Sequence, residues 1–576
     1  MKKISTLFVA LCAMASAVAQ NHGSMNFIGN STFTATLFNA SQSTVKDTVI
    51  VGDSNTSVTL PAMTYNGLTI PAIKYVNLAY TMTGSYMTGD MAFVWAKQYA
   101  DTTITLADNT TKELKNVSLT VTYTHTSGQL DVDATFTYGT MQSPIHYVQT
   151  GFYTQSSNEW NLVGRGTAAN PYRIFEAADF KLLADSISAT NKGTGQYFIV
   201  MNDIDFGGNA ETPAQLPSIG KAAVASITSV AWGFNGTLDG NGKSISGIYH
   251  TENTNSDAGK FNALFSSLDT LGVIKDLTFT DNNSINSYNY AAPFACMSKG
   301  IISGCTNKAN VTAANAFAAG ICGYLVSGLG TIDGCKNYGN VSAQTYATGI
   351  VSGSQYAKTI TELNYAVSNC ENYGAMTCSK GSGAAGIVGS YSGAVTDCTN
   401  HGTIGTADLG TGIGGIASAV MYNAKVEGCT NNGAVAGQKQ VAGIVGNLMK
   451  GEDTDVTVSG CTNNGAVSGT ANVAGIVGNS ARANGIVTLA DCANEGVVTA
   501  PEGCETAGNL RGCSNIVIGE GCTINATLQK LYLDDTTSAI ESVSEVTANA
   551  PAYDLNGRRT NGNGLTISGA KARIVK

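Results

Sequence analysis

A phrase of cysteine, any residue and asparagine recurs through the second half of the chain, and its first seven copies are 28 to 35 residues apart. A second phrase, Gly-Ile-Val-Gly or a variant of it, falls between successive cysteines. Self-similarity at a fixed period of this length is the signature of one supersecondary unit stacked many times. The seven cysteines are Cys305, Cys335, Cys370, Cys398, Cys429, Cys461 and Cys492, and Cys513 begins an eighth copy.

Each unit contains three short apolar runs separated by polar turns, as at 465–468, 473–478 and 486–492. Three parallel strands make one triangular coil, and successive coils stack at about 4.8 Å. We therefore expect residues 160–530 to form a right-handed parallel β-helix, with roughly ten to twelve coils after residue 195 and a length on the order of 50 to 60 Å. Helical repeats are excluded because no unit has helical periodicity and because the glycine density would destabilise a helix.

Asparagine follows each repeat cysteine by two residues, so stacked coils would place these side chains above one another. Each amide would then donate a hydrogen bond to the next, as in other stacked β structures. The glycines two residues further on, from Gly339 to Gly496, are expected to take the left-handed conformation that ends a turn. Ala309 replaces glycine in the first unit, where we expect a different turn. The expected ladder asparagines are Asn307, Asn337, Asn372, Asn400, Asn431, Asn463 and Asn494.

Thirteen of the 14 cysteines follow residue 20, an odd number for an exported chain. Equivalent cysteines on neighbouring coils would have parallel Cβ vectors, which disfavours disulfides. Cys322 also occupies the position of Val388 and Val445, as a small buried apolar residue would. We expect a ladder of buried free thiols. Some disulfides, or a metal site in a chain without a Cys-x-x-Cys pair, are the alternatives.

Residues 1–19 predict a signal peptide, since Lys2 and Lys3 precede an apolar stretch at 7–18 and a small-x-small site at 17–19. The mature chain would begin at Gln20 and be extracellular or on the outer cell surface, with the periplasm as the alternative. Lipidation would require Cys12, which follows Leu11 inside the apolar run. No second apolar run approaches the roughly eighteen residues of a spanning helix.

Within an expected domain at 20–155, residues 26–153 alternate apolar and polar side chains, most clearly at 117–123 and 130–138, with the short segment 125–128 between them. This pattern predicts an antiparallel hairpin within a β-barrel or sandwich. A charged content of 12% and 67 glycines fit an all-β chain of short strands and tight turns. The net charge of −9, without a basic cluster, excludes nucleic acid as the expected partner.

The segment 59–71 and the closing Gly151-Phe152-Tyr153 resemble the calycin-like domains found at the N-terminus of many secreted Bacteroidota proteins. The resemblance covers about a fifth of the chain. It implies a lipocalin-related barrel able to hold a small ligand. The alternative is a packed barrel whose aromatic side chains fill the core.

The segment that begins the solenoid has an amphipathic pattern over 174–187, the phrase NDID at 202–205 and the phrase F-x-G-T-x-D-G-N-G at 234–242. This order resembles the start of bacterial surface β-helices that carry GLUG-type repeats. The resemblance implies that the helix caps the N-terminal end of the stack, where strand edges would otherwise be open.

The chain ends in a polar linker at 536–550 and a segment at 551–576 that resembles the C-terminal sorting-type segment of secreted Bacteroidota proteins. There the phrase YDLNGRR, here at 553–559, and a basic terminal strand form a small hairpin. The usual G-K-K-V phrase is replaced by Gly-Ala-Lys-Ala at 569–572.

Parallel β-helices host polysaccharide lyases and glycoside hydrolases, so an enzyme of that class is the alternative to a binding protein. Hydrolysis needs converging carboxylates, and lyase chemistry needs a basic residue beside a Ca²⁺ cluster. Asp203, Asp205 and Asp239 are the best acidic candidates for catalysis or Ca²⁺, whereas the histidines are dispersed and His401 occupies a turn position.

No catalytic residue or cofactor is expected. The chain is interpreted as a monomeric, non-enzymatic adhesion protein for a glycan or a surface protein, with coil-face tyrosines such as Tyr338, Tyr346 and Tyr373 available for contact.

Overall fold

The structure is a computed structural model. The signal peptide predicted at 1–19, with its cleavage site, lies outside the residues that it describes, as do most of the linker and of the C-terminal segment. The described residues are 24–35, 40–52, 55–65, 68–85, 87–99, 102–105, 111–141, 143–154, 160–189, 193–214, 219–222, 230–250, 254–255, 259–327, 329–355, 364–380, 383–405, 410–449, 454–480, 486–499, 507–509, 515–518, 543–544, 552–553, 559–560 and 566–567.

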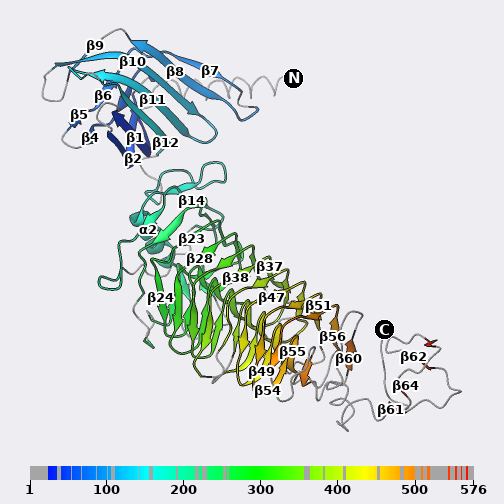
Figure 1. The fold of residues 1–576 in the computed structure, drawn as a ribbon. Helices are drawn as coiled ribbons and strands as arrows, with labels where there is room; N and C mark the ends of the chain where they lie inside the picture. The colour runs from blue at the N-terminus through cyan, green and yellow to red at the C-terminus, as the bar shows by residue number, and fades with distance from the viewer. Residues whose placement is uncertain are drawn as a thin grey trace. The chain divides into compact units, whose positions relative to one another are not determined.

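The protein is mostly β and divides into two compact units, residues 1–175 with 196–199 and residues 176–195 with 200–576. The first unit is built on one curled antiparallel sheet (Figure 1). Its hydrogen-bonded order is β6-β3-β2-β1-β12-β11-β10-β8-β7, with β9 on β10, and this path does not return to β6. The antiparallel region expected at 20–155 is therefore an open half-barrel.

The long strands of this unit, such as β1 and β11, alternate buried and more exposed side chains, as the sequence predicts. Val121 lies opposite Val132 in the hairpin of β10 and β11, and Gly128 closes its turn with a φ of 68°. The strands are β1 Met25–Ala35, β2 Ala40–Val51, β3 Val58–Leu60, β4 Met63–Tyr65, β5 Leu68–Ile70, β6 Ile73–Tyr75, β7 Tyr80–Thr83, β8 Ala92–Tyr99, β9 Thr102–Thr105, β10 Thr111–Thr124, β11 Gln129–Tyr138, β12 Ile145–Tyr153 and β13 Tyr172–Ile174.

Large apolar side chains fill the buried side of the half-barrel. Phe27, Phe136 and Tyr147 are fully buried there, and Phe27 meets Tyr123 edge to face at 5.5 Å between ring centroids. Aromatic pairs in this geometry contribute beyond their buried area. Packed aromatic side chains thus occupy the side of the sheet on which a lipocalin-like ligand would have to lie.

The helix expected at 174–187 is α2, Ala177–Ala189, and begins later because β13 extends the chain as far as Ile174. Phe180, Leu183 and Ile187 are fully buried, and the Phe180 ring lies 6.0 Å from that of Phe206. Figure 1 draws α2 beside the first strands of the solenoid. Among the described residues, no helix is long and apolar enough to cross a bilayer.

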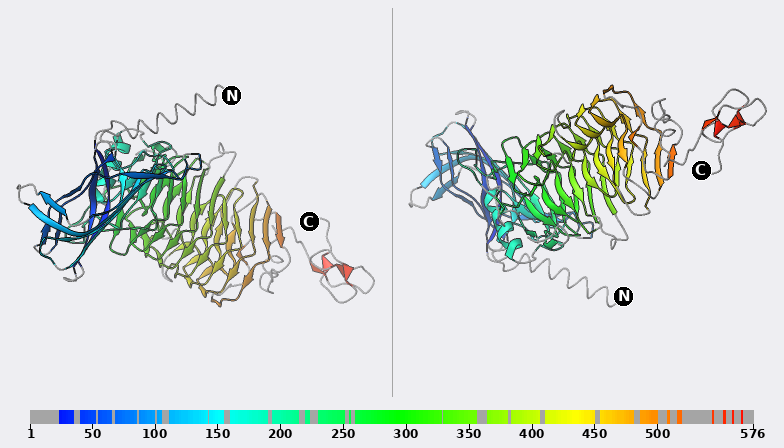
Figure 2. Two further views of the ribbon diagram at one scale, coloured as in Figure 1. Left: turned by 90° about the horizontal axis from the view of Figure 1, so that it is seen from above. Right: turned by 90° about the horizontal axis from the view of Figure 1, so that it is seen from below.

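The second unit is a parallel β-solenoid in which equivalent strands of successive coils stack side by side (Figure 2). One of its sheets takes one strand from each coil and has nine strands, so about nine coils are present instead of ten to twelve. Residues before 260 account for part of the difference, because they include an antiparallel hairpin of β16 Lys221–Ala222 and β17 Val230–Trp232. Nine coils at about 4.8 Å give a length of roughly 40 Å.

Most coils contribute five short strands instead of the three expected. A representative coil consists of β27 Ile301–Ser303, β28 Thr306–Asn307, β29 Asn310–Ala313, β30 Phe317–Ala319 and β31 Cys322–Leu325. Equivalent strands form five stacks. Four of them are continuous: β18 Thr237–Asp239 to β60 Asn515–Ile518, β15 Ile204–Asp205 to β57 Ala493–Asn494, β20 Phe261–Asn262 to β54 Ala471–Ala474, and β21 Phe265–Leu268 to β59 Ala507–Asn509. The fifth is interrupted and runs from β24 Ser284–Ser287 to β39 Met376–Cys378 and again from β48 Val435–Ala436 to β58 Val498–Thr499.

A residue in the left-handed conformation precedes every repeat cysteine up to Cys492. The φ angles of Gly334, Asn369 and Asp397 are 61°, 53° and 53°, in a region that Gly, Asn and Asp tolerate best. This kink divides one side of the coil into two strands, such as β27 and β28, and explains part of the higher strand number. The stacked residues are Gly304, Gly334, Asn369, Asp397, Gly428, Gly460 and Asp491.

The prediction that the glycines from Gly339 to Gly496 adopt the left-handed conformation is wrong, because none of them has a positive φ. A Cβ atom on Gly402 would instead lie 1.9 Å from the carbonyl oxygen of Gly374 in the preceding coil. Glycine is required here by the close approach of two coils. The different turn expected at Ala309 is not found, since Asn307 Nδ2 donates to the Ala309 carbonyl at 2.9 Å, as Asn337 does to Gly339 at 2.8 Å.

Candidate functional site

The asparagines of the repeat form one continuous ladder inside the ten-stranded sheet from β15 to β57, which we call the asparagine sheet. In each step Nδ2 of one asparagine donates to Oδ1 of the next at 2.7 or 2.8 Å, from Asn307 to Asn494. The same Nδ2 atom donates to the backbone carbonyl two residues further on. The amides are buried but satisfied, so this predicted set of residues has a structural role.

Two stacks of glycine enclose the ladder. On one side lie the glycines that follow each asparagine, and on the other lies the first glycine of each Gly-Ile-Val-Gly phrase. A Cβ atom on Gly386 would stand 2.3 Å from Cγ of Asn400. The two sequence phrases are therefore coupled, because the glycine of one leaves the space that the asparagine of the other fills.

The repeat cysteines stack beside the ladder as buried thiols, and the ten described cysteines form no disulfide. Sγ of Cys335 lies 3.4 Å from the carbonyl oxygen of Asp333 and 3.6 Å from that of Ile302 in the preceding coil. Burial raises the pKa of the Cys335 and Cys370 thiols well above the ordinary value. Protonated thiols are poor nucleophiles and poor metal ligands.

The acidic candidates do not converge. Asp203 Oδ1 accepts hydrogen bonds from the backbone N–H and hydroxyl of Ser244 at 2.8 and 2.9 Å. Asp205 accepts from the Gly207 N–H at 2.9 Å, and Asp239 forms an ion pair with Lys275 at 2.6 Å. Within the described part of the chain, no group of three or more acidic, histidine or cysteine side chains is placed to hold a metal ion.

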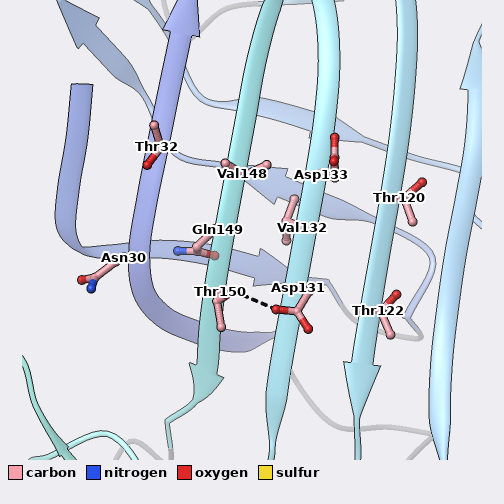
Figure 3. A pocket seen from close by; sticks show the side chains of 10 residues that line it. All are labelled: Asn30, Thr32, Thr120, Thr122, Asp131, Val132, Asp133, Val148, Gln149 and Thr150. Atoms are coloured by element: carbon pink, nitrogen blue, oxygen red, sulfur yellow. Dashed lines mark hydrogen bonds between the residues drawn. The ribbon is translucent and has the colours of Figure 1, made fainter. Parts of the chain in front are cut away.

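The half-barrel carries a polar hollow of about 520 Å³ on the side of the sheet opposite its core. Figure 3 shows Asp131 and Thr150 on neighbouring strands, joined by a hydrogen bond of 2.8 Å. Asp131 also accepts from Gln129 Nε2, and Asp133 lies 3.0 Å from His146 Nε2. These carboxylates are occupied by neighbours on their own sheet, and no aromatic side chain lines the hollow.

A second surface, on the outer face of the asparagine sheet, carries exposed aromatic rings. Tyr338 stacks on Tyr373 at 4.6 Å between centroids with an interplanar angle of 6°, and Tyr373 stacks on His401 at 4.5 Å and 9°. Tyr338 and Tyr373 are 45% and 39% exposed. We call these three side chains the Tyr–His stack; it places His401, expected only as a turn residue, within a surface group.

Charged side chains border the Tyr–His stack. Lys336 lies 3.1 Å from Glu371, and the Tyr373 hydroxyl donates to the same carboxylate. That hydrogen bond raises the pKa of Tyr373 to about 12 and, with Lys336, lowers the pKa of Glu371. The two charges neutralise one another, so the face around Tyr373 is polar without a strong field of either sign.

The face continues beyond Tyr338 into a hollow of about 690 Å³, lined by Thr278, Asp281, Thr306, Lys308 and Tyr338. Sequence reasoning singled out Tyr338 but missed the other four. Lys308, Tyr338, Tyr373 and His401 all lie three residues after an equivalent repeat cysteine, and this shared position was the available signal.

Tyr346, the third tyrosine expected on a coil face, lies in a different column. Its ring stacks on Phe317 at 5.3 Å, next to Tyr290 and Phe261 in the preceding coils. The structure thus brings Tyr338 and Tyr373 together and leaves Tyr346 outside the group.

Comparison with known proteins gives distant similarities, and no family model matches the chain. Halomucin of Haloquadratum walsbyi is 30% identical over 152 residues, which are 26% of this chain and 2% of that protein. The chain therefore spans a small fraction of the relative's length. The crystal structure of a "putative immunoglobulin A1 protease" from Bacteroides ovatus aligns with a TM-score of 0.30 and 16% identity over 62% of this chain and 86% of that one. Neither similarity shows a family, and the chain is defined by its half-barrel and its solenoid of about thirty-residue coils.

Proposed function

We propose that this chain is an exported, non-enzymatic binding or adhesion protein whose solenoid attaches to glycans or to other surface proteins. The observation that carries the proposal is the Tyr–His stack, exposed on the outer face of a parallel sheet. Exposed aromatic rings with polar neighbours suit sugars and protein side chains, and a solenoid repeats one contact surface over several coils.

The residues beside the stack support a polar ligand. Thr306, Thr399, Thr430 and Thr462 take the same position in their coils and are partly exposed on the outer face. Hydroxyl groups donate and accept hydrogen bonds without adding charge. With a net charge of −9 spread over the whole chain, this face favours a neutral partner over a nucleic acid.

The alternative function is that of a polysaccharide lyase or glycoside hydrolase. It would need free carboxylates, whereas Asp203 accepts hydrogen bonds from Ser244 and Asp239 is paired with Lys275. An enzyme of this class would release reducing or unsaturated ends from a polysaccharide, and a binding protein would not.

One experiment separates the two functions. The secreted protein is incubated with mannan, xylan, polygalacturonate and mucin glycans, and both its retention and the release of chain ends are measured. Retention without release supports the binding protein, while release that Asp203→Asn or Asp239→Asn abolishes would establish the enzyme. Absence of both would direct the search to a protein partner, beginning with the segments 353–366 and 449–456.

A further inference from the structure

The hollow beside Tyr338 lies at the end of the Tyr–His stack. One face of the Tyr338 ring is covered by Tyr373 of the following coil. The hollow is lined by Tyr338 together with residues of the two preceding coils, so the other face of the ring is turned toward it. An aromatic ring with one face covered and one open is a stacking platform of fixed orientation.

The hollow exists because two adjacent coils have corners of unequal length. Thr278 pairs with Thr306, and Ser284 pairs with Asn310, so the first corner contains two more residues than the second. Asn283 anchors the longer corner: it is buried, and its Nδ2 donates to the carbonyls of Ile245 and Thr280 at 2.8 and 2.9 Å. Asp281 lies on this corner, exposed, as one wall of the hollow.

Two opposite charges line the hollow without neutralising one another. Neither the Lys308 ammonium group nor the Asp281 carboxylate has a side-chain partner in the part of the chain that the structure describes. Lys308 offers donors only and Asp281 offers acceptors only, whereas the hydroxyls of Thr278 and Thr306 offer both. A ligand with several adjacent hydroxyl groups can use all of these, while a net anion would meet Asp281 and a net cation would meet Lys308.

We propose that this hollow binds a neutral pyranose ring of a glycan, stacked on the open face of Tyr338 and hydrogen-bonded to Asp281 and Lys308. This inference rests on the proposed binding function and names its site and ligand class. A volume of about 690 Å³ lies within the range of small-molecule sites and accommodates more than one sugar ring. The ladder of Asn307 and Asn337 directly beneath gives the platform a rigid base.

The test uses the full chain and four variants on immobilised mannan, galactan and xylan, with polygalacturonate as the acidic polysaccharide. Tyr338→Ala is expected to weaken retention on the neutral polysaccharide that binds best by roughly tenfold or more, as the loss of a central aromatic contact does. Asp281→Asn and Lys308→Met are each expected to weaken it several-fold, since each removes a charge while keeping a side chain of similar size. Asn464→Ala is the matched control, because Asn464 occupies the Tyr338 position four coils further on and should change retention by less than about twofold.

The outcomes distinguish the site from the function. Retention of the unaltered chain that is insensitive to Tyr338→Ala would overturn the site and leave the binding function intact. No retention on any polysaccharide would overturn the site and would leave a protein as the partner of the proposed binding function. Retention on polygalacturonate alone, lost in Lys308→Met and kept in Asp281→Asn, would replace the neutral sugar by an acidic one and also overturn the inference. Thermal unfolding of each variant at the same temperature as the unaltered chain confirms that lost retention is a lost contact, since all four side chains are exposed.

Discussion

The half-barrel and the solenoid both pair the backbone N–H and C=O groups of their strands, but the paired strands are related differently in the two units. In the half-barrel the first strand pairs with the last, so that Phe27 lies opposite Tyr153, and the sheet is complete only when its whole length has folded. In the solenoid each strand pairs with the equivalent strand one coil away, such as Thr306 with Lys336. The half-barrel should therefore lose stability as a unit, whereas the solenoid should lose it coil by coil.

The largest expected effect is in the half-barrel. Phe27→Ala removes a fully buried ring that contacts Tyr123 and Tyr153, and should cost about 3 to 5 kcal/mol of unfolding free energy. Hydrogen exchange measured by mass spectrometry should then accelerate in β1, β2, β11 and β12 together. Asn26→Ala, at an exposed neighbouring position, is the control. Faster exchange confined to β1 would contradict unit-wise unfolding.

The next effect concerns the close approach of coils. Gly402→Ala places a methyl group 1.9 Å from the Gly374 carbonyl oxygen and should destabilise the solenoid by about 1 to 3 kcal/mol, with the half-barrel unchanged. Gly334→Asn is the matched control, because a Cβ atom there meets nothing closer than 3.9 Å and Asn369 already occupies the equivalent position. Equal losses in the two variants, measured by urea unfolding, would show that steric contact between coils is not the reason for Gly402.

The asparagine ladder is expected to matter most at its centre. Asn431→Ala orphans polar groups above and below it and should cost roughly 1 to 3 kcal/mol, whereas Asn494→Ala, at the last step, should cost less. Equal losses at the two positions in urea unfolding would argue against a ladder whose members depend on both neighbours.

The smallest expected effect concerns the thiols, which only one of the two units contains. No cysteine lies between Cys12 and Cys296, so every thiol after Cys12 belongs to the second unit. Burial raises the pKa of Cys335 and Cys370, so alkylation of these thiols at pH 8 should be slow in the native protein, and about thirteen thiols should react after unfolding without reductant. A count near one would show disulfides.

The same thiols give the two units different pH dependence. Their folded pKa lies above the unfolded value, so the native state holds its protons longer, and the stabilisation is lost as the pH rises past the ordinary thiol value of 9.0. Urea unfolding measured across this pH range should show the unfolding free energy of the solenoid falling before that of the half-barrel, which contains no thiol. Parallel loss in both units would show that other groups dominate.

The repeat could be recognised from the sequence because stacked coils demand the same residue at the same position, and the alternation in β10 and β11 predicted a sheet with one buried face. The role of individual glycines could not be assigned in this way. Gly334 and Gly402 look alike in the sequence, yet one adopts a left-handed φ and the other avoids a collision with the preceding coil. That distinction depends on the distance between coils.

The candidate site was predictable only in part, for a similar reason. Tyr338 and Tyr373 stand out as aromatic residues at one repeat position, but the hollow beside Tyr338 arises from two extra residues in a single corner. The repeat describes what the coils share, and a binding site here is made where one coil departs from its neighbours. Lys308 and Asp281 lie in different coils, and only the stacking of these coils brings both residues to one hollow.

The ladder also bears on how a chain of this kind can change its length. Each interior asparagine donates toward the next coil and accepts from the previous one with the same two atoms, as Asn400, Asn431 and Asn463 do. A duplicated coil inserted between two others would find a donor on one side and an acceptor on the other, and a deleted coil would leave its neighbours able to bond to each other. Gain or loss of a whole coil of about thirty residues therefore leaves no interior amide unpaired, whereas gain or loss of a single residue breaks the register of every side chain in that coil.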